Sequence, residues 1–225
     1  MPFDVKTFRT RTLTAVIFAI VMLVGLLWNG WSFALLFIII HFGCWYEFVK
    51  LMKKIFPQKY FYFIPLGLVY ITLPVLMMMD LRFTPVTRFQ ELNALIIPCA
   101  IVFSIWINDT MAYIAGSFIG KTPFSKISPK KTWEGTIGGA LLCVFVMTII
   151  AVSTKTLSIK DAIAIAAICA LFGTAGDLLE SKLKRQAGVK DSGNFMPGHG
   201  GFLDRFDSFL IAVPFVWIYV FFFMR

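Results

Sequence analysis

The stretch MPGHGGFLDRFDS, residues 196–208, stands directly before FLIAVPFVWIYVFFF, residues 209–223. Glycines, a histidine, two aspartates and an arginine therefore crowd together at the start of an apolar run. A helix that spans a bilayer needs roughly 20 mainly apolar residues, and this run approaches that length. Ionisable groups beside a membrane segment are costly and usually serve a function. The stretch therefore predicts a membrane helix whose entrance carries a functional site.

The composition of the whole chain agrees with a polytopic membrane protein. It has 225 residues, of which 59% are hydrophobic and only 15% are charged, whereas a soluble domain carries about 25% charged residues. We expect an all-α bundle forming one integral membrane domain, 1–225, with transmembrane helices in 1–105 and a catalytic half in 106–225. No cleavable signal peptide is expected, because no small-residue cleavage site follows the first apolar run.

Apolar runs alternate with polar segments along the chain, which predicts about seven transmembrane helices. The Lys/Arg-rich segments fall on one side of the membrane in strict alternation, and the positive-inside rule makes that side cytoplasmic. We therefore expect a cytoplasmic N-terminus. The fourth run is interrupted by Asn108 and Asp109, so it can be read as one helix or as two pieces. The predicted spans are 13–28, 31–49, 61–79, 92–119, 136–152, 162–179 and 208–224.

The net charge of +9 does not require a nucleic-acid partner. Positive-inside loops and anionic lipid headgroups account for it, and no basic arm interleaved with aromatic residues occurs, so no nucleic-acid binding is expected. The cysteines lie singly in apolar runs without metal-ligand spacing. They are expected to be small buried side chains.

The first polar cluster ends the sixth apolar run. Asp177, Glu180, Ser181 and Lys184 are spaced i, i+3, i+4 and i+7, so they share one face if the helix continues. An acid at the end of an apolar span usually faces a cavity or a partner. The alternative is an amphipathic helix leaving the membrane with ordinary interfacial charges.

The second cluster is the opening stretch. The glycines around His199 indicate backbone that approaches something closely or adopts positive φ. Asp204 and Asp207, one turn apart near Arg205, are explained either as helix caps or as ligands of a hard cation such as Mg²⁺ bridging phosphate oxygens. Because Mg²⁺ prefers oxygen ligands, His199 is not assigned to the metal.

Two further clusters lie upstream. SPKKTWEG, residues 128–135, offers hydroxyls and cations for phosphates, or is simply a positive-inside anchor loop. WINDTMAY, residues 106–113, places Asp109 within a span, as a functional acid or as a hydrogen-bonding link between helices. All four clusters are predicted to meet at the cytoplasmic side.

The run SKLKRQAGVKDSGNFMPGHGGFLDRFD, residues 181–207, resembles the signature of the phosphatidate cytidylyltransferases, with every spacing kept. Met196 stands where the family usually has Leu, Ile or Phe. NDTMAY, SPKKTWEG and GDLLES also resemble characteristic segments of that family. The resemblance covers residues 106 onward, while the N-terminal half matches only as membrane helix. The chain is shorter than many bacterial members, so we expect one or two spans to be missing relative to them.

The resemblance implies that CTP and phosphatidic acid in the membrane react to CDP-diacylglycerol and pyrophosphate. It further implies Mg²⁺ with a possible second cation, a homodimer, and an active site on the cytoplasmic face of a bacterial inner membrane. Metal binding is implied for Asp177 and Asp204, with Asp109 and Asp207 as further candidates. Phosphate contacts are implied for Lys184, Arg185, Lys190 and Arg205, and Asp191 and His199 complete the catalytic set. The implied substrate-binding residues are Ser128, Lys130, Lys131, Thr132, Ser181, Gly198, Gly200 and Gly201.

Three other functions remain as alternatives at this stage, and a fourth is discounted. A CTP-dependent polyprenol kinase or an archaeal-type lipid cytidylyltransferase uses similar parts, although a kinase needs a base to activate its alcohol. An ion-coupled transporter predicts polar groups spread across the membrane depth and repeated broken helices, which the sequence lacks. CDP-alcohol phosphatidyltransferases are marked by an Asp-Gly pair, and none occurs here.

Overall fold

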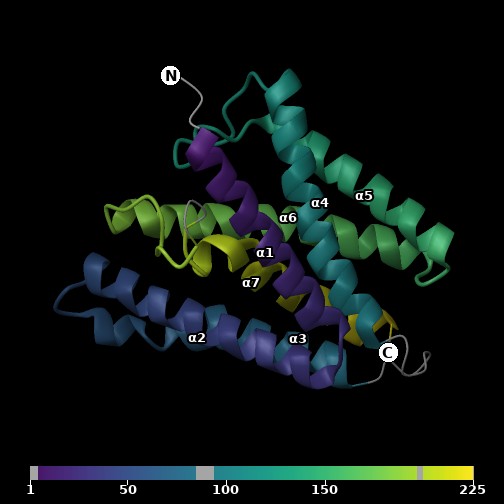
Figure 1. Cartoon of the computed structure of the whole chain (residues 1–225), viewed down its shortest axis with the longest axis horizontal. Helices are drawn as coiled ribbons and strands as arrows, with labels where there is room; N and C mark the ends of the chain where they lie inside the picture. The colour runs from purple at the N-terminus through teal and green to yellow at the C-terminus, as the bar shows by residue number, and fades with distance from the viewer. Residues whose placement is uncertain (1–4, 85–93, 197–199, 225) are drawn as a thin grey trace. The chain divides into compact units, whose positions relative to one another are not determined.

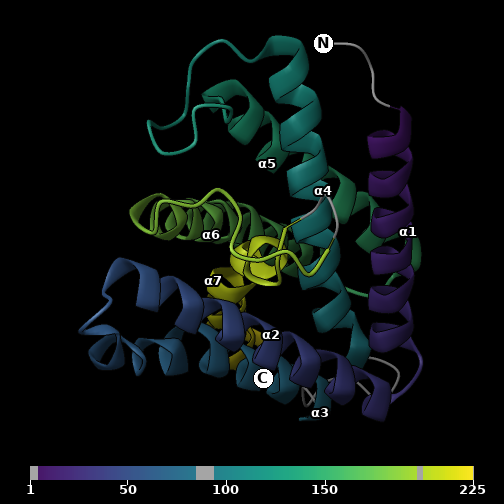
Figure 2. The same cartoon turned by 60° about the vertical axis from the view of Figure 1, so that its left-hand side comes forward.

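The structure is a computed structural model that describes residues 5–84, 94–196 and 200–224. Regular structure in these ranges is helical (Figures 1 and 2). A 3₁₀ turn, Tyr60–Phe63, and a π turn, Leu68–Thr72, precede α3, and a π turn, Val220–Met224, continues α7. The α-helices are α1 (Val5–Leu27), α2 (Gly30–Ile55), α3 (Leu73–Phe83), α4 (Ile96–Ile119), α5 (Trp133–Thr154), α6 (Ile159–Gln186) and α7 (Leu203–Tyr219).

The predicted helical membrane protein is confirmed. Within the described residues, six helical segments are long and apolar enough to cross a bilayer, and the apolar part of α1, Thr12–Leu27, is shorter. Each of the seven predicted runs overlaps a helical segment, although residues 92 and 93 of the fourth run lie outside the described residues. The helices extend past the apolar runs at several ends, so that α6 continues to Gln186 and α7 begins at Leu203 rather than at Ser208.

Of the two readings of the fourth span, the structure supports the single helix, because α4 runs through Asn108 and Asp109 without a break. Both residues keep a backbone N–H for the helical ladder, and their helix propensity is only moderately unfavourable. A polar pair in an apolar run therefore marks a costly position in the membrane, not a helix end.

The chain forms two compact units, each built from two separate stretches of sequence. The first unit contains Met1–Thr72 and Leu183–Phe206, and the second contains Leu73–Lys182 and Asp207–Arg225. The functional division expected at residue 105 stays a prediction.

Helix α2 is the central element of the first unit. Asn29 caps it: the Asn29 side chain accepts from the Ser32 amide at 2.8 Å, and the Ser32 hydroxyl accepts from the Asn29 amide at 3.0 Å. Its buried side chains recur at helical spacing, as an apolar face requires. The same buried set includes one acid, Glu47. The buried apolar residues of α2 are Phe33, Leu36, Phe37, Ile40, Cys44, Phe48, Leu51 and Met52.

In the second unit, small residues bring helices close together. A Cβ on Gly139 of α5 would overlap Ala112 of α4, so these two helices pack with backbones in near contact, as small residues permit in membranes. Likewise, a Cβ on Gly176 of α6 would overlap the backbone carbonyl of Asp207 on α7. The start of α7 in this unit is therefore held directly against the polar end of α6.

Candidate functional site

A lysine–aspartate pair lies in the first unit, between the end of α6 and the first turn of α7. The Nζ atom of Lys184 donates to Oδ1 of Asp204 at 2.6 Å. The side chains are only 12% and 6% exposed, respectively. Burial of this kind makes the attraction strong but leaves each charge dependent on its partner.

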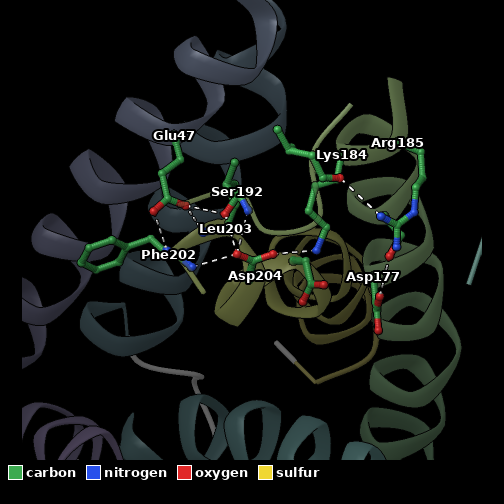
Figure 3. A network of polar contacts seen from close by, with 12 residues as sticks. Glu47, Asp177, Lys184, Arg185, Ser192, Phe202, Leu203 and Asp204 are labelled. Atoms are coloured by element: carbon green, nitrogen blue, oxygen red, sulfur yellow. Dashed lines mark hydrogen bonds and ion pairs between the residues drawn. The ribbon is translucent and has the colours of Figure 1, made fainter. Parts of the chain in front are cut away.

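The second oxygen of Asp204 organises the segment that precedes α7. Its Oδ2 atom accepts from the Ser192 amide at 2.8 Å, the Ser192 hydroxyl at 2.9 Å and the Gly201 amide at 2.7 Å (Figure 3). Asp204 therefore acts both as a local cap and as the ion-pair partner of Lys184, and its reading as a metal ligand stays a prediction. We call Glu47, Lys184, Ser192 and Asp204 the Asp204 cluster.

Glu47 belongs to this cluster, and the sequence-based prediction missed it. It is 3% exposed on α2, and its carboxylate accepts from the Ser192 hydroxyl and from the amides of Phe202 and Leu203 (Figure 3). An acid inside the apolar run of residues 31–49 was the available signal, because intramembrane acids are functional candidates by default.

The glycines of the opening stretch have two roles. Gly200 has φ +83, a backbone conformation that a residue without Cβ adopts easily. At Gly201 the close approach is made by the Glu47 carboxylate, which a Cβ there would overlap. Gly198 and His199 lie outside the described residues.

A second lysine–aspartate pair lies in the second unit. Lys131 pairs with Asp177, and their side chains are 29% and 28% exposed. The Ser181 hydroxyl donates to Oδ1 of Asp177 at 3.3 Å, which agrees with their predicted common helix face. Buried Asp207 lies within electrostatic range of both members of this pair and of exposed Asp109. We call Asp109, Lys131, Asp177, Ser181 and Asp207 the Asp177 cluster.

The loop 121–132 presents Lys131 to Asp177. The Phe124 amide donates to the Lys131 carbonyl at 2.7 Å, and the Lys131 amide donates to the Ser128 carbonyl at 3.1 Å. The Thr132 hydroxyl caps α5 by accepting from the Gly135 amide at 3.1 Å. The backbone around Lys131 is thus pinned on both sides.

Glu134 holds the other end of this loop. Its carboxylate accepts from the amides of Lys121 and Thr122 and from the Thr122 hydroxyl. Anionic groups in the first turn of a helix are also favoured by the helix dipole.

The remaining predicted residues are not drawn into either cluster. Arg185 donates to the Val189 carbonyl at 3.3 Å, beyond the end of α6. Among the predicted site residues that the structure describes, the exposed side chains without a described polar contact are Lys130, Lys190, Asp191 and Arg205.

The carboxylate oxygens of the Asp177 cluster are suitable ligands for a magnesium ion. Among the described residues, no group of three or more His, Cys, Asp or Glu side chains is close enough to hold a metal. However, Mg²⁺ usually binds through one or two carboxylates plus substrate phosphates. Asp177 and Asp207 provide such oxygens. Asp204 fits less well, because both of its oxygens already accept from the chain's own donors.

Comparisons with known proteins point to one family. A model of the cytidylyltransferase family matches residues 66–223, more than half of the chain. The phosphatidate cytidylyltransferase of Staphylococcus haemolyticus is 47% identical over 113 residues, which are 49% of this chain and 43% of that protein.

Two further relatives carry similar names. The phosphatidate cytidylyltransferase of Bacillus subtilis is 45% identical over 115 residues, 50% of this chain and 43% of that protein. The chloroplastic phosphatidate cytidylyltransferase 5 of Arabidopsis thaliana is 43% identical over 115 residues, 51% of this chain and 28% of that protein. The matched region thus spans less than half the length of these relatives.

Proposed function

This chain belongs to the cytidylyltransferase family, and on that premise we propose that it transfers the cytidylyl group of CTP to phosphatidic acid. The products are CDP-diacylglycerol and pyrophosphate. The observation that carries the proposal is the Lys131–Asp177 pair, because the loop and helix that it joins supply the cation and the carboxylate that nucleotidyl transfer needs. The names of the curated relatives support the same substrates.

The reaction asks little of a general base. A phosphomonoester has its second pKa near 6, so the lipid phosphate is largely dianionic at neutral pH. One of its oxygens forms a bond to the α-phosphorus of CTP, while the bond from that phosphorus to the bridging oxygen of the β-phosphate breaks and pyrophosphate leaves. The barrier lies in bringing two polyanions into line and neutralising them.

The residues divide these tasks in our proposal. Asp177, with Asp207 and Asp109, holds Mg²⁺, and Asp204 is a further candidate through Oδ1. Bound there, the metal supplies positive charge to the phosphates during transfer. Lys131 exchanges its contact with Asp177 for the triphosphate. Lys184 contacts a phosphate while it remains positioned by Asp204. The exposed cations Arg185, Lys190 and Arg205 neutralise the anionic substrates on approach.

The setting is also proposed. The protein acts in a bacterial inner membrane, with CTP arriving from the cytoplasm and phosphatidic acid arriving laterally from the lipid, and it functions as a homodimer. The apolar helices support the membrane location, and the alternation of basic segments supports the orientation.

The direct test is transfer of label from CTP to lipid. Purified protein is reconstituted with phosphatidic acid and Mg²⁺, and CTP is labelled at the α- or the γ-phosphorus. We expect α-label, and no γ-label, in the organic phase, with loss of transfer in Asp204→Asn. Label entering lipid only from the γ-position identifies a lipid kinase instead. Transfer from neither position, with folded protein, overturns the proposed reaction and returns the transporter to consideration.

A further inference from the structure

We infer that Glu47 is a positioning residue that fixes Asp204 and the start of α7 through its contacts with Ser192, Phe202 and Leu203. In the sequence it lies far outside the motifs at the C-terminal end of the chain. The kinetic part of the inference rests on the proposed function, whereas its structural part does not.

Every described polar contact of Glu47 is one in which its carboxylate accepts. Oε1 accepts from the Phe202 amide at 2.9 Å. Oε2 accepts from the Leu203 amide at 2.9 Å and from the Ser192 hydroxyl at 2.6 Å. An acceptor-only set suits an ionised carboxylate. Burial of such a charge is costly unless hydrogen bonds compensate it, so Glu47 and its donors depend on one another.

Two of these donors belong to the N-terminus of α7. The amides of Arg205 and Phe206 donate to the Phe202 carbonyl, so Phe202 is the N-cap residue directly before α7. The first amides of a helix have no acceptor within it. Glu47 supplies that acceptor from another helix, and its negative charge is favoured at this end. The orientation of the first turn, which carries Asp204, is thereby tied to α2.

Ser192 connects Glu47 to Asp204. Its hydroxyl lies 2.6 Å from Oε2 of Glu47 and 2.9 Å from Oδ2 of Asp204. A hydroxyl has one proton, so it donates to one carboxylate at a time or shares its proton between them. A displacement of Glu47 therefore moves Ser192 and changes the donors available to Asp204.

Glycines stand at the positions where the chain approaches Glu47 and Phe202 most closely. A Cβ on Gly193 or Gly201 would overlap the Glu47 carboxylate, and a Cβ on Gly43 would overlap the ring of Phe202. Gly43 and Glu47 are one turn apart and share a face of α2. One face of α2 thus contacts both the ring of Phe202 and the backbone amides of Phe202 and Leu203. This close fit argues for a specific packing contact.

The test compares Glu47→Gln with Asn29→Ala. Gln keeps the volume, but its NH₂ group faces a backbone amide and one donor loses its acceptor. We expect kcat of cytidylyl transfer to fall about 10- to 100-fold, as for residues that orient a primary ligand, with KM for CTP changed less than roughly threefold. Asn29→Ala removes the cap of the same helix away from the cluster. It is expected to lower the melting temperature and leave kcat unchanged.

Ser192→Ala completes a double-mutant cycle. If Glu47 acts through Ser192, the combined variant loses less kcat than the product of the two single losses. Independent, multiplicative effects overturn the connection through Ser192. Should Glu47→Gln not fold, Ser192→Ala alone is still expected to lose kcat, and full activity in that variant counts against the inference.

Hydrogen exchange separates this inference from the proposed reaction. The amides of Phe202 and Leu203 are expected to exchange faster in Glu47→Gln than in the wild type, whether or not the protein is active. Inactive wild type with the expected exchange overturns the reaction and keeps the positioning role. Active wild type with unchanged exchange and kcat within about twofold in Glu47→Gln overturns the positioning role.

Discussion

The two lysine–aspartate pairs differ in their burial and in how many hydrogen bonds the aspartate accepts. Asp204 is 6% exposed and accepts from Lys184, Ser192 and Gly201. Asp177 is 28% exposed and is held by Lys131 and a long contact from Ser181. The first pair is locked before any ligand arrives, whereas the second can exchange partners at lower cost. The same chemical pair thus serves as a fixed support in one unit and as an adaptable contact in the other.

The largest effect is expected for Asp204→Asn, which breaks the locked pair. Removing one partner of a buried ion pair costs about 3–5 kcal/mol, because the remaining charge is left without compensation. We expect loss of transfer together with a fall in the free energy of unfolding of this size. Denaturant unfolding in micelles measures it, and an inactive variant of wild-type stability contradicts the supporting role.

Asp177→Asn tests the adaptable pair. Partly exposed ion pairs contribute about 0–1 kcal/mol, so unfolding is expected to change little. Transfer is expected to fall on the order of 100-fold, as when one electrostatic stabiliser of a transition state is removed, and the Mg²⁺ requirement is expected to rise. Kinetics across a Mg²⁺ titration check this. A large loss of stability without a change in the Mg²⁺ requirement makes Asp177 structural.

Lys131→Met tests whether the lysine leaves Asp177 for CTP. Hydrogen bonds to charged groups contribute about 1.5–3 kcal/mol, so KM for CTP is expected to rise roughly tenfold or more. Lys160→Met is the matched control, because Lys160 lies outside the loop 121–132, and this variant is expected to keep its KM for CTP. Equal effects in the two variants indicate a general charge effect rather than a phosphate contact.

Glu134→Gln is expected to have the smallest effect. The change weakens contacts to Lys121 and Thr122 that shape the loop carrying Lys131. Net hydrogen-bond contributions of about 0.5–1.5 kcal/mol correspond to a KM increase of roughly two- to tenfold. A fall in kcat at unchanged KM assigns Glu134 to the chemical step instead.

The helical segments could be predicted from the sequence, but not their ends. Apolar runs report which residues lie in hydrocarbon, whereas a helix ends where its backbone loses hydrogen bonds. The polar residues through Gln186 therefore remain helical in α6, and Asn108 and Asp109 remain helical in α4. Polar residues alone therefore mark neither the end of a helix nor a break within one.

The members of the candidate site were easier to predict than their pairings. The motifs named Lys131, Asp177, Lys184 and Asp204, but nothing in their spacing indicated which lysine meets which aspartate. Glu47 itself was marked by its place in an apolar run, but its partners were not, because two of its three donors are backbone amides, which leave no signature in side-chain patterns. The assignments to metal, the homodimer and the membrane orientation stay predictions.

The cap that Glu47 provides also has a consequence for the order of synthesis. Its donors lie 145 to 156 residues later in the chain, so the ribosome completes α2 long before they exist. Until residues 192–203 emerge, the carboxylate has none of these compensating contacts, and an isolated charge in a membrane helix is costly. The first unit therefore cannot complete these contacts until its second stretch, Leu183–Phe206, has been synthesised, and a nascent chain halted before Ser192 carries an unfinished N-terminal unit.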